Sequence, residues 1–255
     1  MQHGRTIVLT GAAGVVGRAL LAELAGRPVI ALTHREPVAD AESLRCDITQ
    51  PRLGLDPVAY RELADRADVI IHSAAQTDFK APAESYARVN VGGVENMIAF
   101  AVDADAPIYH ISTAFVHGLR PDAPLALPDD NLIVGYVRSK IEGERLLAAS
   151  GVPHAVFRPP NLTGNARTGR IARPQILQLV CDFICRGKVP MFPAWPGARV
   201  DLVPQDLLAR AVVAVLDAGE TGTDYWVTAG EDALTLAQIV GACTDLMERI
   251  GQPID

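Results

Sequence analysis

The stretch T-G-A-A-G-V-V-G, residues 10–17, decides the fold of this chain. It follows residues 6–10, a short apolar run of the kind found in buried parallel strands, and it opens residues 14–25, where apolar side chains recur at helical spacing. The first glycine allows a tight turn, the second lets the backbone approach a pyrophosphate, and the third lets helix and strand pack closely. The N–H groups at the helix N-terminus would bind phosphates. The stretch therefore predicts a dinucleotide-binding βα unit.

The same rhythm continues along the chain. We expect further strands at residues 29–32, 69–72, 108–112 and 155–158. We expect helices between them at residues 56–67, 84–102 and 136–150. Strands that alternate with helices of about ten or more residues indicate βαβ units and a parallel sheet covered on both faces. The sequence therefore predicts an α/β fold, a Rossmann doubly wound parallel sheet.

Prolines interrupt this pattern after about residue 160, and helices are expected near residues 174–186, 205–217 and 235–250. We predict a single domain over residues 1–255. Residues 1–160 would form the dinucleotide-binding core. Residues 161–255 would form mainly a small C-terminal substrate-binding part, with some return to the sheet, that caps the carboxyl ends of the strands, where ligands bind in such sheets.

Composition narrows the class of protein. The 255 residues are 49% hydrophobic and 21% charged, as in an ordinary globular protein, and the net charge of −7 argues against nucleic-acid binding and gives no attraction to an anionic membrane. The start of the chain predicts no signal peptide, and no apolar run approaches the ~20 residues of a membrane span. The spacing of the four cysteines fits no zinc ribbon. We expect no metal, reduced thiols and a cytoplasmic location.

The end of the second strand indicates which nicotinamide nucleotide would bind. A site for NAD(H) usually carries Asp or Glu there to accept the ribose 2′-hydroxyl, but residues 32–35 read L-T-H-R without an acid. Arg35 would instead pair with a 2′-phosphate, and Arg18 would help. We therefore predict NADP(H) rather than NAD(H). The alternative is that Arg35 is a solvated loop charge.

Tyr136 and Lys140 lie four residues apart at the start of a predicted helix, so both side chains would point into one cleft. A nearby cation would favour the phenolate and bring the pKa of Tyr136 towards working pH, which would make it a proton donor to a carbonyl oxygen. Ser112 and Thr113, at the end of a strand, could hydrogen-bond the same carbonyl. The tyrosine–lysine spacing alone is common by chance, but here it follows the glycine loop and the strand-end hydroxyls in order.

Taken together, these motifs resemble the extended short-chain dehydrogenase/reductase superfamily. The matching positions are T-G-A-A-G-V-V-G (10–17), C-D-I-T (46–49), H-S-A-A (72–75), Asn90, S-T-A-F-V-H-G (112–118), Y-V-R-S-K (136–140), R-P-P-N (158–161) and D-L-V-P-Q-D (201–206).

The resemblance implies a catalytic triad of Thr113, Tyr136 and Lys140, with Ser112 as the fallback hydroxyl. Lys140 would also hold the nicotinamide ribose, and Asp47 would meet the adenine amino group. The residues expected to contact the dinucleotide are Gly11, Ala13, Gly14, Val15, Val16, Gly17, Arg18, His34, Arg35, Asp47, Ile48, Ala74, Ala75, Tyr136, Lys140, Pro159, Asn161 and Leu162.

Within the superfamily, residues 72–79, 112–118 and 158–169 resemble thioester reductases and fatty acyl reductases. Those enzymes use NADPH to release a small-molecule or carrier-bound acyl substrate as an aldehyde or alcohol, so the resemblance implies an acyl thioester as substrate. The alternatives are an NAD(P)-dependent nucleotide-sugar epimerase or ketoreductase, and a non-catalytic NADP sensor. A homodimer built on helices 84–102 and 136–150 would follow by analogy. Candidate pocket residues are Gln76, Asp78, His117, Asn161, Phe192 and Trp195.

Overall fold

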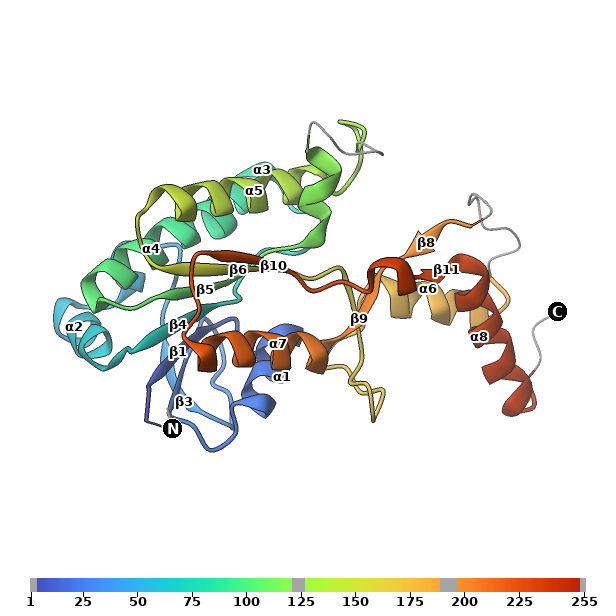
Figure 1. Cartoon of the computed structure of the whole chain (residues 1–255), viewed down its shortest axis with the longest axis horizontal. Helices are drawn as coiled ribbons and strands as arrows, with labels where there is room; N and C mark the ends of the chain where they lie inside the picture. The colour runs from blue at the N-terminus through green and yellow to red at the C-terminus, as the bar shows by residue number, and fades with distance from the viewer. Residues whose placement is uncertain (1–3, 121–126, 189–196, 253–255) are drawn as a thin grey trace.

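A seven-stranded parallel sheet forms the centre of the molecule in the computed structural model, which describes residues 4–120, 127–188 and 197–252 (Figure 1). Phe192 and Trp195 lie outside the described residues. The strand order is β3-β2-β1-β4-β5-β6-β10, and each neighbouring pair is parallel. The strands are β1 (Ile7–Thr10), β2 (Val29–Thr33), β3 (Glu42–Arg45), β4 (Val69–His72), β5 (Ile108–Ile111), β6 (His154–Arg158) and β10 (Thr223–Trp226).

This strand order reverses between β1 and β4, and ligands of open α/β sheets bind at such a reversal, outside the carboxyl ends of the strands. The Rossmann fold predicted from the glycine loop is therefore confirmed. The half-exposed edge strand β3 was not predicted, because its residues Glu42–Arg45 carry only one apolar side chain.

Helices cover both faces of the sheet, because alternate residues of each strand point to opposite sides. On one face Leu9 packs with α1 and α7, and on the other Val8 packs with α2, α4 and α5 (Figure 1). The helices are α1 (Val15–Glu23), α2 (Pro57–Arg66), α4 (Gly92–Ala104), α5 (Val134–Ala149) and α7 (Gln205–Ala218). Two buried apolar layers thus hold the sheet rigid under its carboxyl edge.

The helix predicted over residues 84–102 is present, but it contains a π-helical turn that was not predicted. The segment consists of α3 (Ala83–Tyr86), a π-helical turn η2 (Ala87–Val91) and then α4. In the π turn the side chain of Asn90 is 2% exposed and binds the backbone N–H of Gln76 (2.7 Å) and the hydroxyl of Ser139 on α5 (2.8 Å). These bonds tie the loop after β4 to α5, and a π turn of this kind is frequent near functional sites.

A small lobe stands beside the sheet (Figure 1). In it, α6 (Ile176–Cys185) packs against α8 (Leu236–Arg249), and β8 (Arg199–Val200) pairs antiparallel with β11 (Leu234–Thr235). The strand pair β7 (Asn161–Thr163) and β9 (Leu202–Pro204) leads to and from the lobe. The remaining short elements are η1 (Pro51–Gly54), η3 (Ala114–Leu119) and η4 (Gly230–Asp232). Among the described residues no helix is long and apolar enough to span a bilayer.

Candidate active site

The glycine loop has no room for side chains at two of its positions. Gly11 has a φ of +72°, and a Cβ there would lie 2.7 Å from the backbone nitrogen of Ala74. A Cβ on Gly17 would lie 2.1 Å from the carbonyl oxygen of Gly11. The loop therefore closes tightly between β1 and α1 and against the loop after β4. This close approach of backbone to backbone is what the glycine spacing predicts.

The N-terminus of α1 is open to an anion. Its N-cap residue is Gly14, no side chain caps the helix, and the first turn contains no acid. The unpaired N–H groups and the positive end of the helix dipole therefore suit the phosphates of a dinucleotide. Arg18 lies one turn further on, and its Nε donates to the carbonyl of Ala13 (3.2 Å), which holds its cation over the loop. The loop thus fits a dinucleotide.

The other residues predicted to bind the dinucleotide follow the carboxyl ends of the strands. Because all seven strands run parallel, these residues share one edge of the sheet. His34 and Arg35 follow β2 and are exposed, Asp47 and Ile48 come shortly after β3, Ala74 and Ala75 follow β4, and residues 159–162 follow β6.

Asp47 is held in a tight turn, where its carboxylate accepts hydrogen bonds from the backbone N–H and the hydroxyl of Thr49 (2.9 and 2.8 Å). Partial burial acts to raise the pKa of Asp47, but these bonds and the nearby His34 and Arg88 lower it overall. Asp47 is therefore an ionised acceptor at neutral pH, as a partner for an amino group must be.

Thr113 and Tyr136 meet at the end of β5. Both side chains are buried, at 4% and 8% exposed, and the Thr113 hydroxyl lies close enough to influence the phenol of Tyr136. Burial raises the pKa of Tyr136 to about 12, and the Thr113 hydroxyl acts in the opposite direction without cancelling it. The predicted shift of this pKa towards neutrality is wrong in the described structure. The phenol therefore stays protonated at neutral pH, which is the form that a proton donor needs.

Ser112, the fallback hydroxyl, is engaged elsewhere. Its Oγ bonds the carboxylate of Glu144 on α5, and Glu144 in turn pairs with Arg158 (2.7 Å). Arg158 also pairs with Asp224 on β10 (2.6 Å). This network ties α5 to β6 and β10 and leaves Thr113 as the hydroxyl beside Tyr136.

Lys140 is held by two polar contacts at the end of β5, and a cleft shared with Tyr136 stays a prediction. Its Nζ donates to the carbonyl of Ile111 (2.8 Å) and lies 3.3 Å from Nε2 of His110. The side chain is 2% exposed. Burial lowers the pKa of Lys140 from its ordinary 10.5 to about 8, although Glu144 acts to raise it. The lysine thus lies under the carboxyl edge of the sheet as a buried cation.

This lowered pKa predicts how stability depends on pH. Below pH 8 the folded protein holds a buried charge that the unfolded chain holds in water, and between pH 8 and 10.5 the folded state alone loses that proton. Stability due to Lys140 therefore rises across this window. We expect the difference in free energy of unfolding between Lys140→Met and wild type to shift in favour of wild type by up to about 3 kcal/mol from pH 7 to pH 10.5.

Urea unfolding at pH 7, 8, 9 and 10 measures this difference, and subtracting the wild-type curve cancels the other titrating groups. Lys80→Met, at an exposed lysine, is the matched control and should show a flat difference. A flat difference for Lys140→Met as well would mean that Lys140 titrates at its ordinary pKa.

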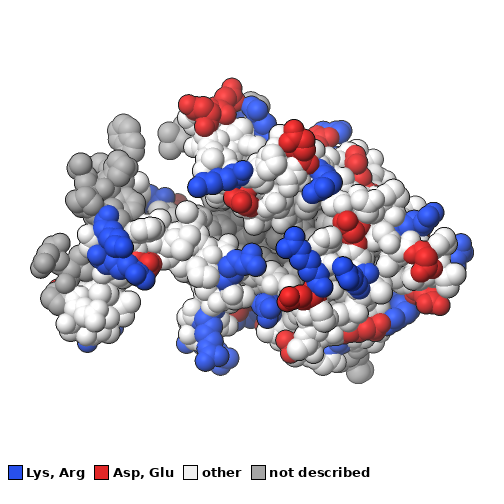
Figure 2. Space-filling model, turned by 180° about the vertical axis from the view of Figure 1, so that it is seen from behind, with Lys and Arg blue, Asp and Glu red and all other residues white. Residues whose placement is uncertain are grey.

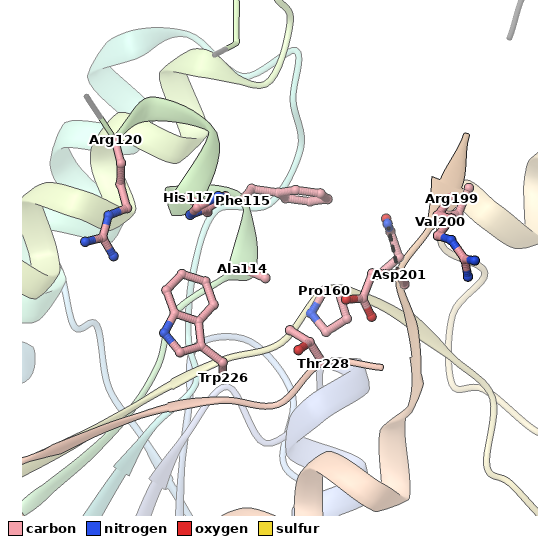
Figure 3. Close-up of a pocket in the computed structure, with 11 residues that line it drawn as sticks. Ala114, Phe115, His117, Arg120, Pro160, Arg199, Val200, Asp201, Trp226 and Thr228 are labelled. Carbon is pink, nitrogen blue, oxygen red and sulfur yellow. Dashed lines mark hydrogen bonds between the residues drawn. The ribbon is translucent and has the colours of Figure 1, made fainter. Parts of the chain in front are cut away.

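A pocket of about 680 Å³ opens directly after Thr113 (Figure 3). It is bounded by η3, by the start of β7, by β8 and by the end of β10, so both the sheet and the small lobe contribute. The lining residues are Ala114, Phe115, His117, Arg120, Pro160, Asn161, Arg199, Val200, Asp201, Trp226 and Thr228.

Trp226 gives this pocket an aromatic wall. It is 40% exposed, Arg158 lies 4.9 Å from its ring centroid, and His117 meets its ring edge-on at 6.1 Å. Figure 3 shows Trp226 and His117 together at one side of the pocket and Arg199 and Asp201 at the other. The pocket therefore combines apolar surface with basic groups.

The pocket contains two of the predicted lining residues, His117 and Asn161. Gln76 and Asp78 are not among its lining residues: the Gln76 amide binds Ser85 (3.3 Å) and Asp78 accepts from the backbone N–H of Lys80 (2.9 Å). The sequence analysis missed Trp226. Its one available signal was an aromatic residue at the end of a strand in the C-terminal part.

Charged side chains of both signs are present, with a net charge of −7 for the chain. Figure 2 shows a hollow in the face behind that of Figure 1, with both basic and acidic side chains around its rim. Within the described residues no group of three or more His, Cys, Asp or Glu side chains is placed to hold a metal ion, and the four cysteines are free.

The NAD-binding family described as Male sterility protein matches residues 40–212, more than half of the chain. The chain belongs to this family. The glycine betaine reductase ATRR of Emericella nidulans is 26% identical over 84% of this chain, but the chain spans only 20% of that relative. The male sterility family match confirms the resemblance to thioester-reductase-like members of the extended short-chain dehydrogenase/reductases.

Solved structures agree with this assignment to the male sterility protein family. The terminal R domain from the myxalamid PKS-NRPS biosynthetic pathway superposes with a TM-score of 0.76 at 26% identity, covering 89% of this chain and 66% of that domain. The Bordetella bronchiseptica enzyme WbmH in complex with NAD+ shares the fold, with a TM-score of 0.73 at 21% identity over 98% of this chain and 82% of that one. The comparisons thus place the chain in a family of NAD-binding proteins whose relatives include reductases.

Proposed function

We propose that the chain uses NADPH to reduce the carbonyl of an acyl thioester, with Tyr136 as the proton donor. One observation carries this proposal: the buried side chains of Thr113 and Tyr136 lie together at the carboxyl edge of the sheet, and a pocket of about 680 Å³ begins at the next residue, Ala114. A carbonyl at the mouth of the pocket would be within reach of both hydroxyls. The relatedness to reductases and to a PKS-NRPS R domain supports a carrier-bound acyl group as substrate.

The residues have separable roles in this chemistry. The bound nicotinamide would supply a hydride to the carbonyl carbon. Thr113 and Tyr136 would hydrogen-bond the oxygen as negative charge develops there, and Tyr136 would then transfer its phenolic proton to it. The resulting hemithioacetal would release the thiol and leave an aldehyde. Lys140 would restore the proton of Tyr136. Alternatively, the Lys140 ammonium would leave the carbonyl of Ile111 when the dinucleotide binds and would then hold the nicotinamide ribose.

The pocket supports an acyl substrate rather than a small polar one. Phe115, Val200 and Trp226 offer apolar and aromatic surface, which an acyl chain would cover. We propose that residues 161–255 act mainly as the substrate-binding part of a single domain and that residues 1–160 bind the dinucleotide. Arg199 and Val200 of the substrate-binding part and Phe115 of the dinucleotide-binding part would then lie on opposite sides of the substrate.

Arg35 would select NADPH over NADH. It is exposed directly after β2, and no acid within residues 32–35 would repel a 2′-phosphate. We expect wild type to bind NADPH at least tenfold more tightly than NADH, and Arg35→Ala to remove that gap, which is ~1.4 kcal/mol or more. Calorimetric titration with both nucleotides measures it.

Arg61→Ala, which removes an exposed arginine from α2, is the control for a general loss of positive charge. Equal binding of the two nucleotides to wild type would overturn the choice of NADP(H). A gap that persists in Arg35→Ala would assign the 2′-phosphate to Arg18 or His34 instead.

The substrate class is tested by following NADPH oxidation with acyl-CoA thioesters of increasing chain length, with the matching free acids and with nucleotide diphosphate sugars. We expect turnover with the thioesters, release of free thiol and no turnover with the acids. A nucleotide-sugar epimerase or ketoreductase is the second candidate, because Arg120 and Arg199 line the pocket and would suit a diphosphate. Turnover confined to the sugars would establish that candidate.

A further inference from the structure

A polar row crosses three neighbouring central strands just beneath the carboxyl edge of the sheet. Thr10 on β1 is paired in register with His72 on β4, and His72 is paired with His110 on β5. All three side chains are at most 1% exposed, and the two rings stack with centroids 5.3 Å apart. Lys140 of α5 reaches the end of the row at His110. Polar side chains are costly in the centre of a sheet, so the row needs an explanation.

Hydrogen bonding fixes the proton on the first ring. The hydroxyl oxygen of Thr10 accepts from the backbone N–H groups of Ser73 (3.1 Å) and Ala74 (3.0 Å). The hydroxyl hydrogen is then left to donate to Nδ1 of His72, 2.7 Å away. His72 must therefore accept at Nδ1 and carry its proton on Nε2, which makes the ring neutral. Thr10 lies next to Gly11, so this bond also joins the row to the glycine loop.

The proton on the His110 ring is fixed by its contact with Lys140. An ammonium group has only donors, so the 3.3 Å contact between Nζ of Lys140 and Nε2 of His110 makes that nitrogen an acceptor. The proton of His110 then lies on Nδ1, and this ring is also neutral. Together with the carbonyl of Ile111, His110 gives the ammonium two fixed acceptors.

Burial, with the nearby Lys140 cation as a second cause, keeps both rings neutral. His110 faces Lys140 from α5, His72 from β4 and His154 from β6, while Lys140 has Glu144 one turn away on its own helix. Burial lowers the pKa of His72 to about 3 and lowers that of His110 well below its ordinary value, and the Lys140 cation adds to both effects. A second cation in this row would be repelled by the first.

We propose that His110 is a positioning residue that holds the ammonium of Lys140 under the active site, while Thr10 separately sets the tautomer of His72, the ring stacked on His110. The catalytic consequence rests on the proposed function of Lys140, whereas the tautomers and the hydrogen bond do not.

Nitrogen-15 NMR of the histidine rings tests the geometry without any turnover. We expect His110 to carry its proton on Nδ1 and His72 on Nε2, with neither ring titrating between about pH 5.5 and 8. In Lys140→Met the Nε2 signal of His110 should shift as its hydrogen bond is lost, while the tautomer of His72 stays. A proton on Nε2 of His110, or titration near the ordinary pKa of about 6.5, would overturn the proposal.

The pH profile of kcat tests the consequence. Without its acceptor at His110, the Lys140 ammonium loses stabilisation, so in His110→Phe the alkaline limb should move down by about one pH unit, with KM unchanged. His110→Gln, whose amide oxygen can accept the same bond, should restore most of the shift. His154→Gln on the neighbouring, less buried position is the control.

Simple damage to the fold would instead lower kcat at every pH without moving the limb, and that result, or a profile identical to wild type, would overturn the positioning role. Should wild type reduce none of the thioesters offered, the proposed function fails. The NMR arm then still decides whether the row is built as described.

Discussion

Replacing Tyr136 with phenylalanine will lower kcat for thioester reduction by about 1000-fold and leave the Kd for NADPH within about twofold, because a positioned general acid contributes roughly 10²- to 10⁴-fold. The phenol lies beside Thr113, and burial keeps it protonated at neutral pH. Phenylalanine preserves the ring packing against Phe79 and Tyr86, whose centroids lie 5.5 and 6.5 Å away. The loss therefore reports the hydroxyl alone.

Single-turnover kinetics with a fixed acyl thioester, together with fluorescence titration of NADPH, measure the two quantities separately. Tyr225→Phe is the matched control, since its hydroxyl binds Glu220 (2.7 Å) away from the pocket residues. A kcat for Tyr136→Phe within about threefold of wild type would assign proton donation to another group. If Tyr136→Phe kept the function of the protein in cells, that result would instead favour a non-catalytic NADP sensor.

Replacing Gly17 with alanine will destabilise the protein by about 3 kcal/mol and abolish measurable dinucleotide binding. The added Cβ would lie 2.1 Å from the Gly11 carbonyl oxygen and 2.5 Å from the Cα of Ala12. Both obstacles are backbone atoms, so no side-chain rotation relieves the clash. The loop must open, and the turn that would receive the pyrophosphate opens with it.

Thermal unfolding should show a fall in Tm of about 6–12 °C for a chain of this size. Gly241→Ala is the matched control, because a Cβ there, in the interior of α8, meets nothing within 4 Å. That variant should gain about 0.5–1 kcal/mol from the better helix former. Normal dinucleotide binding by Gly17→Ala would show that the loop can move enough to accommodate the added Cβ.

The fold could be predicted because its signals are local and repeated. Thr10 to Gly17 contain the turn, the close contact and the helix start within eight residues, and apolar runs mark the buried strands. The exceptions are elements whose partners are distant in sequence. The π turn at Asn90 depends on Gln76 and Ser139, and no period in residues 84–102 reveals those contacts.

The candidate site was harder to predict because a pocket is built from separate segments. Thr113 and Tyr136 share a motif order, whereas Arg199 joins the pocket from β8 of the small lobe and Trp226 from β10 at the edge of the sheet. The predicted direction of the shift in the pKa of Tyr136 was wrong for a related reason. Sequence spacing places Lys140 on the same helical face but cannot give the burial that dominates, or the competing acceptors Ile111 and His110.

The small lobe has an evolutionary consequence. It supplies Arg199, Val200 and Asp201 to the pocket, while the glycine loop and the Thr113–Tyr136 pair belong to the sheet. If the proposed function holds, mutations in β8 will alter which acyl group is accepted without disturbing the residues proposed to bind the dinucleotide and to donate the proton. Because the two sets of residues lie in different parts of the fold, substitutions in the small lobe could change substrate specificity during evolution while the dinucleotide-binding sheet stays the same.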